Sequence, residues 1–282
     1  MTAHTDILSQ ALEAARAMAR RLDLPCNDLV VLHRSEHVAI RLCPSEVVAR
    51  VRPAGQGSAE DLCRELAVAR HLVRKGAPAV SPITVADAGP YIHGGYGLTL
   101  WRYVEHVAAD ADNRQHMAWA AAALRRIHDA LADFSGALPA FATKVERCYA
   151  LLVDPAALPA LAATDRSFLR TACDRIMTKL DALTMDPVPI HGDAGAHNVF
   201  MTPEGALYAD FSDVCRGPRE WDIGFLPGID LAPFAPIDHD LFSILSDLRS
   251  LCVSVWCWDK YDMPDKREAA EYHLEYLKER FA

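Results

Sequence analysis

The stretch that decides the fold is residues 188–222, which read VPIHGDAGAHNVFMTPEGALYADFSDVCRGPREWD. Its first apolar run leads into a loop that carries Asp193, and this loop closes at Asn198. A strand, the turn Thr202–Gly205 and a return strand then lead to Asp210. Because the strands of a hairpin lie side by side, we predict that Asn198 and Asp210 are neighbours although twelve positions separate them.

These three polar side chains match what phosphoryl transfer requires. That reaction needs a carboxylate beside the attacking hydroxyl and oxygen ligands that hold Mg²⁺ against the phosphates of a nucleoside triphosphate. Mg²⁺ binds a few protein oxygens and keeps several of its waters. Asp193, Asn198 and Asp210 can supply that set, so the pattern favours phosphoryl transfer from a nucleotide.

Three sequence blocks in this stretch resemble those of a known family. They are H-G-D-x-x-x-x-N at 191–198, D-F-x-D at 210–213 and G-P-R-E-W-D at 217–222. In this order and spacing they are similar to the aminoglycoside phosphotransferase family, which shares the protein-kinase-like fold. The resemblance implies that Asp193 is the catalytic base, that Asn198 and Asp210 hold Mg²⁺, and that Asp222 braces the catalytic loop.

The N-terminal half resembles the same family less sharply. Val47–Val51 is similar to the strand whose basic residue binds the α and β phosphates, which would be Arg50, and Glu65 on the following helix would be its ion-pair partner. An arginine stands where kinase-like folds usually have lysine, and it can bind phosphate as a bidentate fork. Arg52 shares the same strand face by the two-residue period, so either arginine can take this role.

Two further segments are expected to contact the nucleotide. The loop His33–His37 stands where a phosphate-covering loop belongs, but it has no glycine, so its contacts would come from the backbone and Ser35. The segment 99–103 resembles the inter-lobe hinge whose backbone binds the nucleotide base; its assigned contacts are Thr99, Leu100, Trp101 and Tyr103.

Three other residues of the catalytic segment have less specific expected roles. His191 is interpreted as a structural hydrogen-bonding residue, because Asp193 is the better-placed base. His197 either packs in the loop or contacts substrate. Asp213 is either a second metal or substrate contact or a solvated carboxylate.

The order of predicted elements indicates an α+β chain with two lobes. The resemblance implies a bilobal protein-kinase-like fold, with an antiparallel-sheet nucleotide-binding lobe over 1–103 and a mainly helical lobe over 104–282 that carries the catalytic loop and substrate site. Ser58 and Asp61 match a helix capping box. Strands are predicted over 29–32, 38–42, 46–52, 83–86 and 97–103. Helices are predicted after Thr5, from the cap at Ser58 to Gly76, and over 117–131, 144–153, 166–183, 241–255 and 266–280.

Composition narrows the class of protein. The net charge of −9 argues against a nucleic-acid partner, which would require a basic surface. The longest apolar stretches, such as Met117–Leu124, are shorter than a membrane span, and no secretory signal pattern is present. The eight scattered cysteines lack metal-site spacing and are expected to be reduced thiols, as in a cytoplasmic protein. A monomer or a homodimer is expected.

The leading hypothesis is an ATP- or GTP-dependent phosphotransferase that acts on a hydroxyl of a small molecule. By resemblance the acceptor is an antibiotic, an aminoglycoside or another natural product, and phosphorylation would inactivate it and give resistance. A metabolic acceptor, such as an amino alcohol, a sugar or a homoserine-like molecule, is the alternative. More distant alternatives are an inactive nucleotide-binding protein and a metal-dependent hydrolase whose ligands would be His191, Asp193, His197, Asp210 and Asp213.

Overall fold

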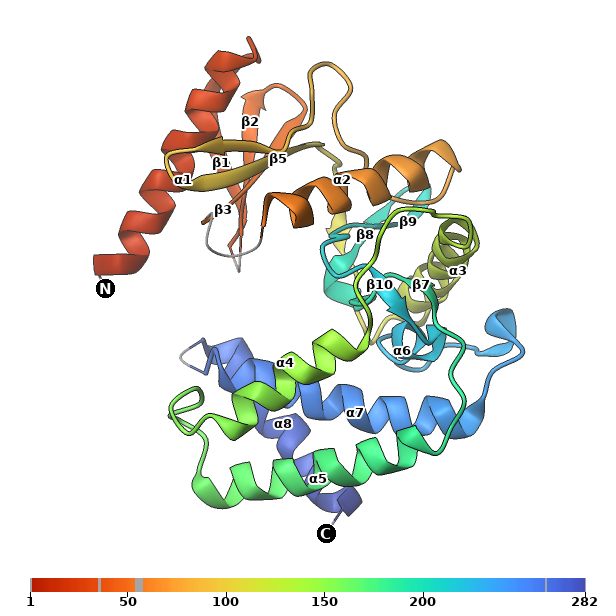
Figure 1. Ribbon diagram of the computed structural model, residues 1–282. Coiled ribbons are helices and arrows are strands. Elements are labelled where there is room, and N and C mark those ends of the chain that lie inside the picture. The colour runs from red at the N-terminus through yellow and green to blue at the C-terminus, as the bar shows by residue number, and fades with distance from the viewer. Residues whose placement is uncertain (1, 35–36, 54–57, 262, 282) are drawn as a thin grey trace. The chain divides into compact units, whose positions relative to one another are not determined.

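The computed structural model describes residues 2–34, 37–53, 58–261 and 263–281 (Figure 1). Contacts between Cα atoms divide the chain into two compact units. Unit 1 comprises Met1–Ala137 and Gly195–Val214, and unit 2 comprises Leu138–Ala194 and Cys215–Ala282. The boundary between two lobes at residue 103, which the family resemblance implies, stays a prediction.

A five-stranded antiparallel sheet with the order β1-β2-β3-β5-β4 forms the first half of unit 1. The expected three-stranded meander is confirmed, because β1, β2 and β3 pair in sequence. Side chains alternate along β3, so Val47, Ala49 and Val51 are buried while Arg50 and Arg52 lie on the other face. The strands are β1 (Cys26–Arg34), β2 (Val38–Pro44), β3 (Val47–Pro53), β4 (Tyr91–His93) and β5 (Tyr96–Arg102).

Two helices pack with this sheet. α1 (Thr2–Arg21) contacts β1, β2 and β3, and α2 (Ala59–Arg74) contacts β5. The capping box that opens α2 is confirmed: the Ser58 hydroxyl accepts from the Asp61 amide, and the Asp61 carboxylate accepts from the Ser58 amide. This cap fixes where α2 begins, and α2 carries Glu65 on its buried side.

The predicted hairpin is present as β8 (Val199–Thr202) and β9 (Gly205–Tyr208), paired antiparallel. β6 (Val107–Ala108) adds a third strand beside β8, and α3 (Arg114–Leu131) packs on β9. A single 3-10 turn, η1 (Ala196–Asn198), leads into the hairpin. Because α3 holds β9, the two ends of the hairpin are fixed within unit 1.

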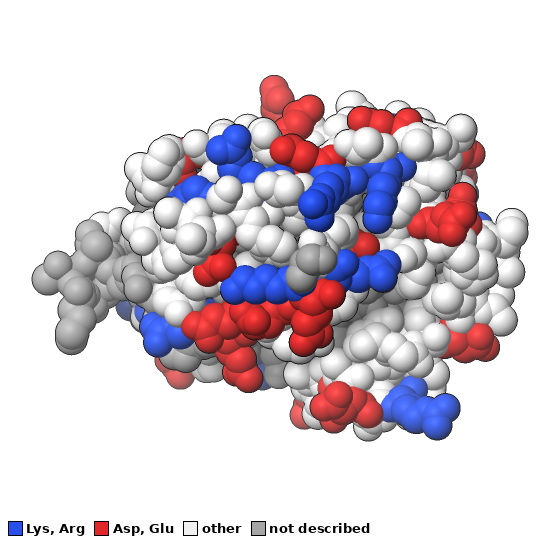
Figure 2. Space-filling view, turned by 90° about the horizontal axis from the view of Figure 1, so that it is seen from below, with Lys and Arg blue, Asp and Glu red and all other residues white. Residues whose placement is uncertain are grey.

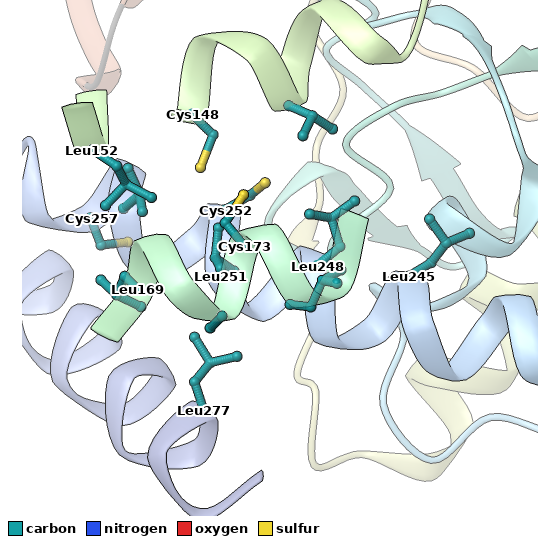
Figure 3. Close-up of a cluster of buried hydrophobic side chains, with 14 of the residues drawn as sticks. Cys148, Leu152, Leu169, Cys173, Leu245, Leu248, Leu251, Cys252, Cys257 and Leu277 are labelled. Carbon is teal, nitrogen blue, oxygen red and sulfur yellow. The ribbon is translucent and has the colours of Figure 1, made fainter. Parts of the chain in front are cut away.

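Unit 2 is a helical assembly around a short ribbon of two antiparallel strands, β7 (Val188–Ile190) and β10 (Cys215–Gly217). Its core joins apolar side chains of four helices, and Figure 3 shows ten of them, Cys148, Leu152, Leu169, Cys173, Leu245, Leu248, Leu251, Cys252, Cys257 and Leu277. The other elements of the unit are α4 (Ala142–Val153), α5 (Ala163–Asp181), α6 (Arg219–Ile223), η2 (Ala232–Phe234), α7 (His239–Trp258) and α8 (Pro264–Phe281).

Helix α7 forms the centre of this core. It contacts α4, α5, α6 and α8. Its length and composition would suffice to cross a membrane, but 61% of its apolar window is buried inside the protein. Burial on this scale is typical of the core helix of a globular unit.

One strand prediction was wrong. Residues 83–86 form no strand, and only an isolated bridge between Pro82 and Trp101 lies near them. The strand beside β5 at the edge of the sheet is instead β4. Its three residues are too few for a visible alternating pattern. β6, β10 and α6 were missed for the same reason, because they are two to five residues long.

The cysteines and the charged side chains have ordinary environments for a globular protein. All eight cysteines are free thiols, and five of them are buried. On the face in Figure 2, Lys and Arg side chains lie next to Asp and Glu side chains. The mixture leaves no extended basic surface on that face.

Candidate active site

An arginine of the sheet and a glutamate of α2 form a buried ion pair in unit 1. Nη1 of Arg50 on β3 donates to Oε1 of Glu65. Glu65 is 2% exposed, and burial raises the pKa of its carboxyl, an effect that the Arg50 charge opposes. The predicted pairing of Arg50 with Glu65 is therefore present in the structure.

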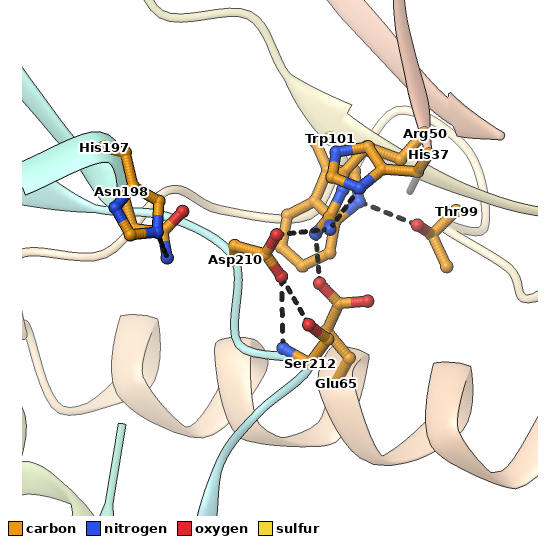
Figure 4. Close-up of polar contacts among 9 residues, drawn as sticks. All are labelled: His37, Arg50, Glu65, Thr99, Trp101, His197, Asn198, Asp210 and Ser212. Atoms are coloured by element: carbon orange, nitrogen blue, oxygen red, sulfur yellow. Dashed lines mark hydrogen bonds and ion pairs between the residues drawn. The ribbon is translucent and has the colours of Figure 1, made fainter. Parts of the chain in front are cut away.

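The same guanidinium also reaches the end of the β8–β9 hairpin. Nη2 of Arg50 lies 2.9 Å from Oδ2 of Asp210, while the amide and hydroxyl of Ser212 donate to Oδ1 (Figure 4). Burial by itself would raise the pKa of Asp210, but the Arg50 charge together with the hydrogen bonds from Ser212 and Arg50 holds that pKa well below its usual range. Asp210 is therefore an anion under all ordinary conditions.

The backbone of Asp210 has a left-handed conformation, with φ of 59°. Few residues other than glycine adopt it, although aspartate tolerates it better than most. The conformation coincides with a carboxylate held by an arginine on one oxygen and a serine on the other. Local strain at a residue fixed in this way is typical of a functional position.

His37 closes one side of this cluster. Its Nδ1 lies 3.4 Å from Nη2 of Arg50. Burial first, and then the neighbouring Arg50 charge, lower the pKa of His37 to about 3, so its ring is neutral. Trp101 lies 5.7 Å beneath the guanidinium and donates its indole N–H to Thr99.

Arg52 lies next to this cluster, as the two-residue strand period predicts. Together with Leu62 and the residues described above, it lines a small cavity, whose full lining is His37, Arg50, Arg52, Leu62, Glu65 and Thr99. Two of its guanidinium nitrogens, Nε and Nη2, are buried without a hydrogen-bond partner in the described part of the chain. Buried donors of this kind normally find an acceptor, and the cavity, of about 10 Å³, has room for a single acceptor atom.

Asn198 lies at the start of the hairpin, opposite Asp210. Its backbone carbonyl accepts from the amide of Ala209, so the prediction that hairpin pairing brings positions 198 and 210 together is confirmed. The Asn198 side chain is buried, with Nδ2 3.2 Å from Nε2 of the exposed His197. An amide oxygen and an ionised carboxylate are the hard oxygen ligands that suit Mg²⁺, so the donor set fits that ion.

The other predicted residues of unit 1 lie as follows. Asp213 is half-buried three residues after Asp210. Ser35 lies outside the described residues. The hinge prediction falls on β5 and the residue after it, where the amides of Leu100, Arg102 and Tyr103 donate to carbonyls of the same unit. These amides are occupied, so contacts between a nucleotide base and this segment stay a prediction.

The loop with Asp193 belongs to unit 2 and is braced from α6. The two oxygens of Asp222 each accept a 2.7 Å hydrogen bond, from the amides of His191 and Gly192. The φ of Gly192 is 84°, which a side chain would oppose, and the indole of Trp221 donates to the carbonyl of Gly192. The loop before Asp193 is therefore held on both sides of its backbone.

His191 has the expected structural position. It is fully buried, and its Nδ1 accepts from the amide of Asp193 at 3.3 Å. The hydrogen bond of Trp221 to Gly192 could not be recognised from the sequence, because no pattern marks which buried indole finds a carbonyl. Phe141 stacks edge-on against Trp221 with the ring centres 4.8 Å apart.

The hydrolase alternative needs a cluster of metal-binding side chains. Within the described ranges, no three His, Cys, Asp or Glu side chains come together in a way that could hold a metal ion. The proposed magnesium ligands include the amide of Asn198, which such a cluster does not contain. The alternative thus lacks the imidazole-rich site that it would need.

Comparisons with known proteins identify the family and the fold of the chain. The sequence model of the phosphotransferase enzyme family matches residues 31–250. No curated protein matches the sequence. The fold resembles amicoumacin kinase hAmiN, solved with AMP-PNP, Ca²⁺ and amicoumacin (TM-score 0.75, 13% identity, covering 99% of this chain and 96% of that one).

Two further solved structures have different acceptors in their names. The aminoglycoside phosphotransferase APH(2")-IIIa, solved with GDP and kanamycin, has a TM-score of 0.71 at 18% identity, covering 94% of this chain and 97% of that one. Choline kinase LicA from Streptococcus pneumoniae has a TM-score of 0.69 at 15% identity, covering 94% and 99%. At these identities the likeness concerns the fold alone, which is α+β and protein-kinase-like.

Proposed function

Because the chain belongs to the phosphotransferase enzyme family, we propose that it transfers the γ-phosphoryl group of ATP or GTP to a hydroxyl of a small molecule. The observation that carries the proposal is the position of Arg50. Its guanidinium lies between a buried glutamate and Asp210, beside a cavity in which Arg52 has buried donors without a partner in the described chain. Two guanidinium groups beside an ionised carboxylate can bind phosphate oxygens and a metal ion, with the cavity itself, of about 10 Å³, taking no more than a single oxygen atom.

In this proposal each residue has a distinct task. Arg50 and Arg52 bind phosphate oxygens, while Asn198 and Asp210 hold Mg²⁺, which when bound neutralises charge on the phosphates. Asp193 orients the acceptor hydroxyl and accepts its proton. Asp222 fixes the loop that carries Asp193 through the amides of His191 and Gly192.

The proposed acceptor is an antibiotic with a free hydroxyl, whose phosphorylation would inactivate it and give resistance. Solved structures with the same fold include complexes with amicoumacin and kanamycin, and the net charge of −9 suits a cationic acceptor. A metabolic amino alcohol is the second candidate, because choline kinase LicA has the same fold. Reduced cysteines and the need for nucleoside triphosphate fit a cytoplasmic enzyme.

The test is a panel assay with purified protein. ATP or GTP with Mg²⁺ is offered with kanamycin, amicoumacin, choline and ethanolamine, and release of ADP or GDP is measured together with the mass of the acceptor. We expect a mass gain of one phosphoryl group on one acceptor class, and a loss of about 10²–10⁴-fold in turnover for Asp193→Asn.

Other outcomes would point to the remaining classes. Equal release of ADP or GDP with and without every acceptor would contradict an acceptor of this kind. Nucleotide binding without turnover on any acceptor would favour an inactive nucleotide-binding protein. Phosphoester hydrolysis with Zn²⁺ or Mn²⁺ and no nucleotide would favour a hydrolase.

A further inference from the structure

Unit 2 contains a second cavity, of about 820 Å³, that none of the residues assigned to phosphoryl transfer lines. It lies between α4 and α5 and reaches the Pro187 and Gly217 end of the β7–β10 ribbon. Asp193 follows the opposite end of that ribbon, where Ile190 pairs with Cys215. The cavity therefore lies at the other end of the ribbon from the catalytic loop.

The walls of this cavity come from one face of each helix. On α4 the lining positions repeat every three to four residues, and α5 contributes a similar stripe. The floor is apolar and buried, and the size is that of a small-molecule site. The floor and walls include Phe141, Val145, Tyr149, Cys173, Met177 and Leu180.

The rim of the cavity is acidic. Glu146 of α4 and Asp174 and Asp181 of α5 line it, all three are exposed, and none has an ion-pair partner in the part of the chain that the structure describes. Arg216 is the one cation among the lining residues, and its guanidinium donates to the carbonyl of Pro187. The lining thus carries three carboxylates against one arginine.

We propose that this cavity binds an amphiphilic organic amine, with its apolar body on the floor and its ammonium group at the rim. An apolar floor alone would admit any apolar molecule, but three unpaired carboxylates at the mouth favour a cation and repel an anion. The half-buried ring of Tyr149 adds a face on which an ammonium group can lie. The inference goes beyond the phosphotransferase activity and does not depend on it.

Three probes that share one apolar skeleton and differ in charge test the proposal: phenylbutylamine, phenylbutanol and phenylbutyrate. Binding to the full chain is measured by calorimetry at neutral pH. We expect the amine to bind more tightly than the alcohol and the alcohol more tightly than the acid. Equal affinities for the three probes would overturn the choice of a cation.

Variants locate the binding. Ala150→Trp adds bulk at an exposed lining position and should abolish binding of the amine; Ala142→Trp does the same from the first turn of α4 and serves if Ala150→Trp fails to fold. Glu146→Gln combined with Asp181→Asn should weaken the amine about three- to tenfold and leave the alcohol unchanged. Glu268→Gln, an exposed position of α8 outside the lining, is the matched control.

Two results separate this cavity from other sites. Asp193→Asn should leave amine binding unchanged; a loss there, or full binding in both tryptophan variants, would move the amine to the phosphotransferase site and overturn the proposal. Self-association that Ala150→Trp abolishes, with no amine binding by the wild type, would make a second copy of the chain the occupant and also overturn it. Phe141 is not substituted, because it stacks on Trp221.

Discussion

Arg50 and Asp210 neutralise each other in this structure, with Nη2 of the guanidinium 2.9 Å from Oδ2 of the carboxylate. One is the proposed phosphate ligand and the other the proposed metal ligand. A metal-bound nucleotide would therefore exchange a protein ion pair for two new ones, Arg50 to phosphate and Asp210 to the metal. Glu65 would keep Arg50 in place during this exchange.

Arg50→Gln should destabilise the fold as well as weaken nucleotide binding. It leaves Glu65 buried without its cation, and breaking one side of a buried pair costs about 3–5 kcal/mol. Urea unfolding measures the loss. The double variant Arg50→Gln with Glu65→Gln should recover part of it; strictly additive losses would show that the pair contributes no coupling energy.

Arg52→Gln should behave differently from Arg50→Gln. No hydrogen bond of its buried Nε and Nη2 is lost within the described residues, so the free energy of unfolding should fall by no more than about 0.5 kcal/mol. Nucleotide affinity should fall about tenfold, because a charge-assisted bond to phosphate disappears. The control is Arg64→Gln, which removes a surface pair of α2; equal nucleotide affinity in both variants would remove Arg52 from the site.

Asp210→Asn should abolish the effect of Mg²⁺ on nucleotide binding. The charge that would hold the metal is gone, while Arg50 is released to bind phosphate, so metal-free nucleotide should bind at least as well as to the wild type. Calorimetry with and without Mg²⁺ measures the nucleotide affinity of each variant and its dependence on the metal. An unchanged response to Mg²⁺ would exclude Asp210 as a metal ligand, and Asp112→Asn, an exposed position, is the control.

Asp222→Ala should lower turnover more than nucleotide affinity. The amides of His191 and Gly192 lose their buried acceptor, at a cost of about 1–3 kcal/mol each, and the Asp193 loop loses its support. Asp222→Asn keeps one acceptor oxygen and should be intermediate. Hydrogen exchange at these two amides, beside steady-state turnover, gives the readout; fast exchange with wild-type turnover would show that the brace is irrelevant to catalysis.

Protonation of His37 should destabilise the protein as the pH falls. Its pKa is 6.5 in the unfolded chain and about 3 in the folded one, so the unfolded state binds the extra proton first. The stability that this ring contributes is complete above 6.5 and is lost progressively as the pH falls toward 3. Urea unfolding of wild type and His37→Gln over this range should converge; parallel curves would show that His37 titrates normally.

Much of this site is readable from the chain, because its information is local. The strand, turn and return strand between Asn198 and Asp210 predict a hairpin, and period-two alternation puts Arg50 and Arg52 on one strand face. The capping box of Ser58 and Asp61 marks where the helix with Glu65 begins. Short strands such as β4 and β10 were not predicted, since three residues are too few to show a period.

The sequence by itself determined which residues are candidates for phosphoryl transfer, because it fixes the types and spacings of the carboxylate, amide and guanidinium groups. Only the tertiary structure decided which of them touch. Three features depend on distances between segments far apart in sequence. Arg50 is shared by two carboxylates, Arg52 has buried donors that are unpaired within the described chain, and Asp222 accepts from two loop amides. Those distances follow from packing, which no local pattern encodes.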